Sequence, residues 1–267
     1  SRGHIDRVWR RESEGMLALA ADPKRWEAPT GAGHWQVRDV IGHLVDTTEA
    51  YFTSFDAARG RGVAPDPLGL TDMATYVDQG ARALRAVPQA ELLARLRTAR
   101  DKMLGIAAEL TDEEWAGLLV PHKYMGPLPA AFYPIFQVVD YAVHSRDIRE
   151  GSGRDHGLDG EAADLLVPLC FILWQNTCTL ADVEPFTVGV RITSGAHAGD
   201  TRVDVSPDAM VFTPGDLDGV ADVIEFDPAS FVLTAYDNEY SSCRSALLSI
   251  SQRRSPTSFQ QHQHLST

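Results

Sequence analysis

The pattern of apolar residues changes at about residue 184, and this change limits the chain to a two-part fold. Before it, apolar residues recur at the i, i+3, i+4 spacing of amphipathic helices. After it, short runs rich in Val, Ile and Phe alternate with Gly, Pro and Asp, which is typical of short strands joined by turns. We therefore expect an α+β chain with an antiparallel helical bundle over 1–184, a small α+β domain over 185–250 and a disordered Ser/Gln-rich tail over 251–267.

Several segments of the first part carry the helical pattern. Residues 37–59 show it most clearly, with one apolar stripe and His43 on the flank of that stripe. Thr111 and Glu114 have the spacing of a capping box, which predicts a new helix start there. The stretch 121–134 contains four prolines, and we expect a loop. The predicted helices cover 5–22, 37–59, 71–87, 88–118, a segment that carries Asp140 and His144, and 161–178.

The second part contains five runs that predict a small sheet. They are FTVGVRI (186–192), TRVDVS (201–206), AMVFT (209–213), DVIEFD (222–227) and SFVLTAY (230–236). Helical content is expected around 245–250.

The composition excludes several classes of protein. The formal net charge of −13 repels phosphate backbones, so we expect no nucleic-acid partner. The longest apolar run, at 165–174, is too short for a membrane span, and Pro168 interrupts it. Three cysteines without a C-x-x-C pair fit a reducing compartment. With no secretion signal recognised, we expect a cytoplasmic monomer or homodimer that does not bind membranes.

Two polar side chains in the second half of the bundle have a spacing that suits metal binding. Asp140 and His144 are four residues apart, so on a helix they project from one face. Such pairs are common and usually lie on a helix surface. With a histidine such as His43 from another helix, they would make a set of two imidazoles and a carboxylate. That set suits Zn²⁺ or another divalent cation and leaves a coordination position open.

The segments around these residues resemble a known family. HWQVRDVIGHLVDTTEAYF (34–52) and VVDYAVHSRDIREGSG (138–153) are similar to the second-helix and fourth-helix motifs of the DinB-like, mycothiol-dependent maleylpyruvate isomerase family. The resemblance implies a DinB-like bundle followed by a sterol-carrier-like domain. In that domain relatives usually continue the segment 226–237 with Gly-Arg, and this chain has Asp237-Asn238 instead.

The resemblance also implies a ligand set and a thiol. The metal ligands would be His43, Asp140 and His144, with Asp140 in place of the Glu of the prototype isomerase and Arg146 where many relatives have Trp. The thiol would be mycothiol, activated as a metal-bound thiolate for S-transfer to a small electrophile or for isomerisation of it. Three alternatives stay open: an S-transferase of sulfur-containing, lincosamide-like natural product biosynthesis, a metal-dependent hydrolase, and a non-catalytic carrier.

Further side chains are candidates near this site, although the sequence assigns no catalytic residue. Asp46 and Thr47 lie within one turn of His43 and could orient its imidazole. Substrate-lid candidates are His122, Tyr124 and Tyr133. The candidates for binding substrate or thiol are Arg82, Tyr124, Arg146 and Arg149.

Overall fold

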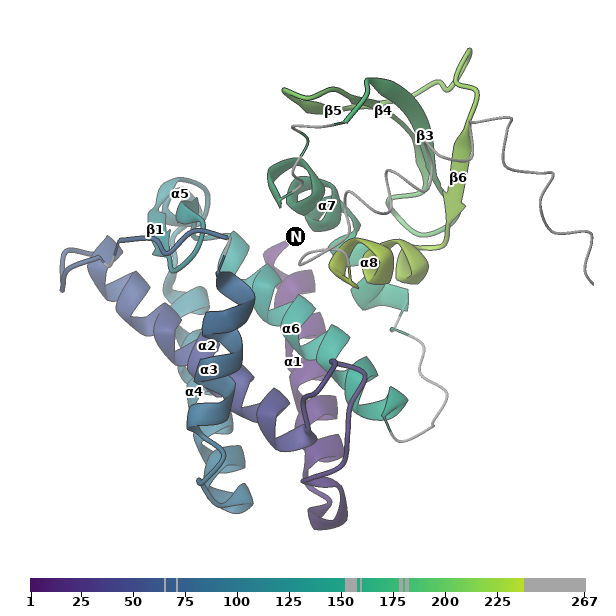
Figure 1. Ribbon diagram of the computed structural model, residues 1–267. Coiled ribbons are helices and arrows are strands. Elements are labelled where there is room, and N and C mark those ends of the chain that lie inside the picture. Colours follow the sequence, from purple (N-terminus) through teal and green to yellow (C-terminus); the bar gives the residue numbers. More distant parts are fainter. Residues whose placement is uncertain are drawn as a thin grey trace, which may run out of the picture. The chain divides into compact units, whose positions relative to one another are not determined.

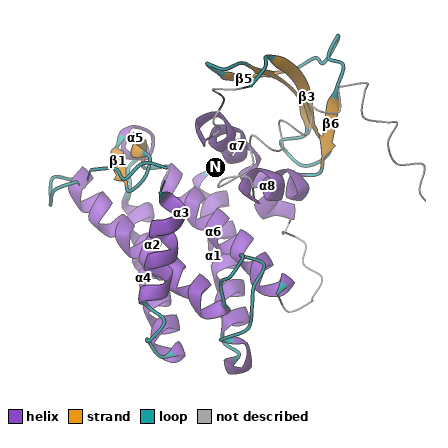
Figure 2. Cartoon of the chain, in the orientation of Figure 1, coloured by secondary structure: helices purple, strands orange, loops and turns teal. Residues whose placement is uncertain are grey.

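The computed structural model describes residues 1–64, 66–70, 72–151, 158, 160–177, 180 and 183–237. The chain divides into two compact units, Ser1–Leu166 and Val167–Thr267. The first is helical and the second contains a four-stranded sheet, which is the α+β organisation that the sequence predicts (Figure 1, Figure 2). The division falls inside helix α7, and the expected domain limits at 184 and 250 stay predictions. The predicted helix around 245–250 and the tail lie outside the described residues.

The first unit is built from helices and one small hairpin. Its elements are α1 (Arg2–Ala20), the 3₁₀ turn η1 (Pro23–Arg25), α2 (Val37–Ala58), α3 (Met73–Ala83), α4 (Gln89–Glu109), α5 (Asp112–Gly117), β1 (Leu119–His122), β2 (Gly126–Pro129), α6 (Phe132–Glu150) and the start of α7 (Gly160–Thr177). Helix α1 packs along α6, and α2 packs against α3, α4 and α6.

The apolar stripe of α2 provides much of the core, as its spacing predicts. The stripe is buried except for Phe52, which is half-buried with the ammonium of Lys102 4.0 Å from its ring centroid. A capping box fixes the start of the helix, because the Gln36 N–H donates to Asp39 Oδ2 at 2.9 Å. The predicted capping box at Thr111 and Glu114 is confirmed, and it separates α5 from α4.

The loop predicted over 121–134 is partly wrong, because a β-hairpin over 119–129 includes much of it. In this hairpin Pro121 lies opposite Pro127, and Pro129 lies opposite Leu119. Opposed residues of antiparallel strands alternate between hydrogen-bonded and non-hydrogen-bonded pairs, and all three prolines have the same parity. We infer that they occupy the non-hydrogen-bonded pairs, where the missing N–H removes no bond from the ladder.

The second unit contains the sheet. Its elements are the rest of α7, β3 (Phe186–Ile192), β4 (Gly199–Val205), β5 (Met210–Pro214), β6 (Val223–Phe226) and α8 (Pro228–Asp237). The strand order is β5-β4-β3-β6, with antiparallel pairs except for the parallel pair of β3 and β6. Four of the five predicted runs therefore form strands.

The fifth run, SFVLTAY, is helical, so the prediction of a strand is wrong there. Asp227 caps α8: its Oδ1 accepts from the Ser230 N–H at 3.0 Å, and its Oδ2 accepts from the Ser230 hydroxyl at 2.6 Å. Pro228 follows at the first helical position, where its fixed φ favours a helix. This start signal outweighs the strand preference of Val and Phe, and Phe231 becomes fully buried.

Helices α7 and α8 carry the aromatic residues that cover the sheet. The ring of Phe171 in α7 lies 5.1 Å from that of Phe212 in β5 and 4.6 Å from that of Phe231 in α8. Helix α7 contains the long apolar run that Pro168 interrupts. Within the described part of the chain, no helix has the length and apolarity that crossing a bilayer requires.

Candidate metal centre

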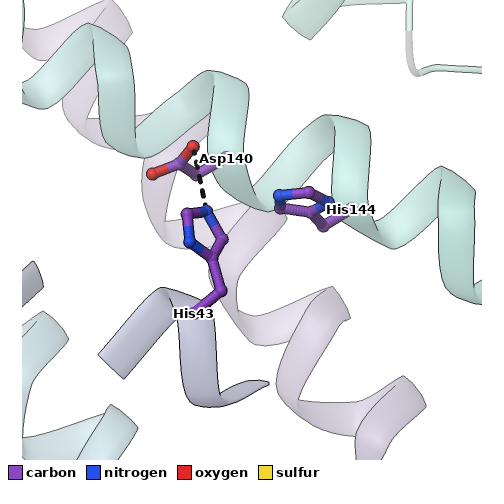
Figure 3. Close-up of side chains that lie close together, drawn as sticks. All are labelled: His43, Asp140 and His144. Atoms are coloured by element: carbon purple, nitrogen blue, oxygen red, sulfur yellow. Dashed lines mark ion pairs between the residues drawn. The ribbon is translucent and has the colours of Figure 1, made fainter. Parts of the chain in front are cut away.

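Helices α2 and α6 bring the three predicted ligands together. His43 projects from α2, and Asp140 and His144 project from α6, one turn apart (Figure 3). One potential ligand atom from each lies within 4.8 Å of the others. His43 Nε2 is 4.0 Å from Asp140 Oδ1, and the two imidazole rings are 5.1 Å apart in an edge-to-face arrangement.

All three side chains are buried, with 5–8% of each residue exposed. Helix α6 is buried along most of its length, so the face that carries Asp140 and His144 lies inside the bundle. A surface pair on a solvated helix, the ordinary explanation of this spacing, is therefore excluded. A buried polar cluster needs partners or a cation to offset its desolvation.

Burial shifts the acid–base properties of the cluster. It lowers the pKa of the His43 imidazole well below its usual value, and the charges of His144 and Lys123 lower it further. Burial also raises the pKa of the Asp140 carboxyl to about 6, which His144 offsets only in part. A neutral imidazole and a carboxylate that lacks a strong cationic partner form a donor set that fits a divalent cation.

Each histidine also contacts a second side chain through Nδ1. Asp147 Oδ2 lies 2.9 Å from His144 Nδ1, and because a carboxylate only accepts, the imidazole donates. The Thr47 hydroxyl lies 3.3 Å from His43 Nδ1, as its place in the sequence suggested. These contacts direct the Nε2 atoms of both rings toward the cluster. Asp46, the other residue considered for this role, is 3.9 Å from Lys123 Nζ instead.

Trp35 covers the two histidines and was not predicted to do so. Its ring centroid lies 5.2 Å from that of His43 and 6.0 Å from that of His144. Its indole N–H donates to Asp78 Oδ1 at 2.9 Å. One signal in the sequence could have indicated it, because Trp35 lies in the same family-like segment as His43.

The four candidates for substrate or thiol binding occupy different places. Arg82 in α3 donates to Asp78 Oδ1 at 2.9 Å, so it contacts the carboxylate that holds Trp35. Arg146 forms ion pairs with Asp147 at 3.3 Å and Glu150 at 3.0 Å. Arg149 lies in the last turn of α6.

Tyr124, the fourth candidate, lies in the turn between β1 and β2. Its hydroxyl is partly buried, which raises its pKa to about 12 with a contribution from Asp46. Lys123 Nζ lies 5.4 Å from the centroid of the Tyr124 ring. The contacts of these four candidates do not assign a substrate. Their roles in binding substrate or thiol stay predictions.

Tyr124 is also a lid candidate, and the other two, His122 and Tyr133, support the hairpin. His122 Nδ1 accepts from the N–H groups of Tyr124 at 3.3 Å and Met125 at 3.2 Å, so its side chain closes the turn. The Tyr133 hydroxyl donates to the Val120 carbonyl at 2.9 Å. Both side chains are therefore committed to contacts within the fold.

Comparison with known proteins identifies the family to which the chain belongs. The family model described as the mycothiol maleylpyruvate isomerase N-terminal domain matches residues 9–149, which is more than half of the 267 residues. The chain belongs to this family. The matched range includes all three clustered residues of α2 and α6.

Two uncharacterized proteins of Mycobacterium tuberculosis, from strains CDC 1551 and H37Rv, are similar to this chain. Each is 28% identical over 151 residues, which are 54% of this chain and 54% of the relative. The chain thus spans about half the length of the curated relatives it matches.

Two crystal structures of the mycothiol-dependent maleylpyruvate isomerase, one of them of a mutant, are similar in fold. Each gives a TM-score of 0.55 at 12% identity and covers 88% of both chains. The similarity extends beyond the family model into the second unit. At this identity it shows a shared fold.

Proposed function

We propose that this protein is a metal-dependent enzyme that uses mycothiol to modify a small electrophilic metabolite. The observation that carries the proposal is the convergence of His43, Asp140 and His144 on one buried point inside the domain that defines the family. A non-catalytic scaffold has no need for three matched ligands from two helices.

The donor chemistry favours Zn²⁺ or a similar divalent cation. Two imidazoles and one carboxylate are ligands that zinc accepts, and three protein ligands leave a position for a further group. A cation bound there would lower the pKa of a coordinating thiol, so that the thiol is a nucleophile at neutral pH.

The chain's own residues supply orientation and charge. Asp147 and Thr47 hold the imidazoles by their Nδ1 atoms. The Asp140 carboxylate would reduce the net charge of an occupied site, and the burial of all three residues limits access of water. An external thiol is the expected nucleophile, because mycothiol is the thiol that the family's description names.

The reaction is either isomerisation or S-transfer. In isomerisation the thiol adds to an unsaturated acid, a bond rotates and the thiol leaves unchanged. In S-transfer the new carbon–sulfur bond is retained and the product carries the thiol. Maleylpyruvate, which the structurally similar isomerase converts, is the first electrophile to test.

The test is a titration of the Co²⁺-substituted full-length protein with mycothiol. Coordination of a thiolate should produce a sulfur-to-cobalt charge-transfer band, and glutathione should produce it only at much higher concentration, since it lacks the glucosamine–inositol portion. Turnover of maleylpyruvate with and without mycothiol, followed by mass spectrometry, distinguishes isomer from conjugate. A Co²⁺ protein that binds neither thiol but hydrolyses esters would support the hydrolase instead.

A further inference from the structure

The segment 29–36 has a defined conformation that carries Trp35 to the metal centre. Both the N–H and the hydroxyl of Thr30 donate to the Trp35 carbonyl, at 3.1 and 2.9 Å. The Gly31 N–H donates to the Asp147 carbonyl at 2.8 Å. A Cβ at Gly31 would come within 2.4 Å of Glu150 Oε2, so the segment approaches α6 closely here and a larger residue would displace the end of the Glu150 side chain.

The Asp78 carboxylate contacts three side-chain nitrogens, one of which belongs to the Trp35 indole. Its Oδ1 lies 2.8 Å from His34 Nε2 and accepts from Trp35 Nε1 and Arg82 Nε, both at 2.9 Å. These bonds lower the pKa of the Asp78 carboxyl well below its usual value despite the opposing effect of burial. Asp78 is therefore an anion that joins α3 to the segment 29–36.

Close packing of α3 on α2 sets the position of this carboxylate. A Cβ at Gly42 would lie 2.6 Å from the Ala81 carbonyl oxygen, so the two helices meet where α2 has no side chain. Gly42 directly precedes His43, and Asp78 lies one turn before Ala81. The same helix contact thus fixes a proposed ligand and the residue that holds Trp35.

We propose that Trp35 is a positioning residue of the metal centre and that Asp78 acts on the centre by holding the Trp35 indole against the His43 and His144 rings. This inference rests on the proposed metal site. The indole restricts both imidazoles to the orientation in which their Nε2 atoms converge. It also covers them with an apolar surface, which strengthens the electrostatic attraction between ligands and cation.

The test measures Co²⁺ affinity and the Co²⁺ absorption spectrum in the full-length protein, because the spectrum reports ligand geometry. Trp35→Ala should weaken Co²⁺ binding by about tenfold or more, the usual effect of losing an outer contact of a ligand, and should change the spectrum. Trp35→Phe and Asp78→Ala should each cause a smaller loss, because the former keeps a ring and the latter keeps the indole. Trp115→Phe is the matched control, since Trp115 in α5 stacks on Arg2 and should leave Co²⁺ binding unchanged.

A double-mutant cycle shows whether Asp78 acts through Trp35. Combining Trp35→Phe with Asp78→Ala should cost no more than the larger single loss, because Phe has no N–H for Asp78 to hold. Full additivity would overturn this part of the proposal. The cycle uses only mild substitutions, so it remains decisive if Trp35→Ala does not fold.

His43→Ala separates this inference from the proposed function. If His43→Ala abolishes Co²⁺ binding while Trp35→Ala leaves affinity and spectrum unchanged, the positioning role is wrong and the metal site stands. If His43→Ala binds Co²⁺ like the wild type, the metal site itself is wrong, and the positioning role fails with it.

Discussion

At the scale of single residues, Asp147 has two roles that connect the metal centre to its surroundings. Its carboxylate accepts from His144 Nδ1 at 2.9 Å, and its carbonyl accepts from the Gly31 N–H at 2.8 Å. The first bond fixes the orientation of the imidazole, and the second fixes the segment that carries Trp35. A carboxylate behind a histidine ligand also makes the ligand more basic.

Asp147→Asn should therefore reduce metal affinity by about 10- to 100-fold, because the neutral amide holds the imidazole more weakly. Competition with a chromophoric chelator measures the affinity. Glu150→Gln is the matched control, since Glu150 also pairs with Arg146 but does not contact the proposed ligands in the bonds described. Equal affinities of wild type and Asp147→Asn would show that this carboxylate does not support the site.

The sequence allowed prediction of only part of this residue network. Asp140 and His144 could be paired because helical periodicity places residues four apart on one face. Asp147 follows His144 by three residues, so the same rule could have identified it. The contact between Trp35 and Asp78 could not be predicted, since it joins residues 43 apart in the sequence and Trp35 lies before helix α2, where no periodicity indicates its direction.

At the scale of elements, the β1–β2 hairpin depends on a buried neutral histidine. The backbone N–H groups of the turn donate to His122 Nδ1, which can accept only while it carries no proton. Burial lowers the pKa of His122 to about 4 from an ordinary value of 6.5. The unfolded chain therefore binds the proton more readily than the folded chain between these two values.

Linkage gives the sign of the resulting pH dependence. The free energy of unfolding should fall as pH decreases from 6.5 to about 4, by roughly 3 kcal/mol from this residue alone. His122→Asn keeps an acceptor but does not titrate, so its profile should be flatter over this window. Urea unfolding at several pH values measures the difference, and parallel profiles would contradict the role of His122.

The start of helix α8 depends on its capping residue, Asp227, which acts against the strand preference of the residues that follow. Asp227→Ala removes both bonds to Ser230 and should destabilise the second unit by about 1 kcal/mol, a typical effect of losing a helix cap. Asp227→Asn keeps an acceptor and should lose less. Urea unfolding followed by near-ultraviolet circular dichroism measures both variants, and no difference between Asp227→Ala and the wild type would contradict the capping role.

The two elements that differ from prediction have a common physical cause. On average proline disfavours strands and β-branched residues disfavour helices, but each effect depends on the position of the residue. In the hairpin, Pro121 and Pro127 lie directly opposite each other. This pairing depends on the strand register, which the local sequence does not determine. In α8, the capping residues before the run decide its conformation.

At the scale of the whole molecule, the change of pattern near residue 184 correctly predicted a helical part followed by a sheet. This prediction succeeded because apolar residues repeat every 3.6 residues in a helix and every 2 in a strand. The difference is visible over a long segment and does not depend on any single residue. The family model matches residues 9–149, and the similar fold of the solved isomerase covers 88% of the chain.

The central claim is that His43, Asp140 and His144 hold one divalent cation per chain. Elemental analysis of the full-length protein tests it most directly, in a His262→Ala/His264→Ala background because two further histidines lie in the C-terminal sequence. We predict about one equivalent of metal in this protein and in its His4→Ala and Asp140→Glu variants. We predict almost none after His43→Ala, Asp140→Ala or His144→Ala. Full metal occupancy in both His43→Ala and His144→Ala would contradict the account.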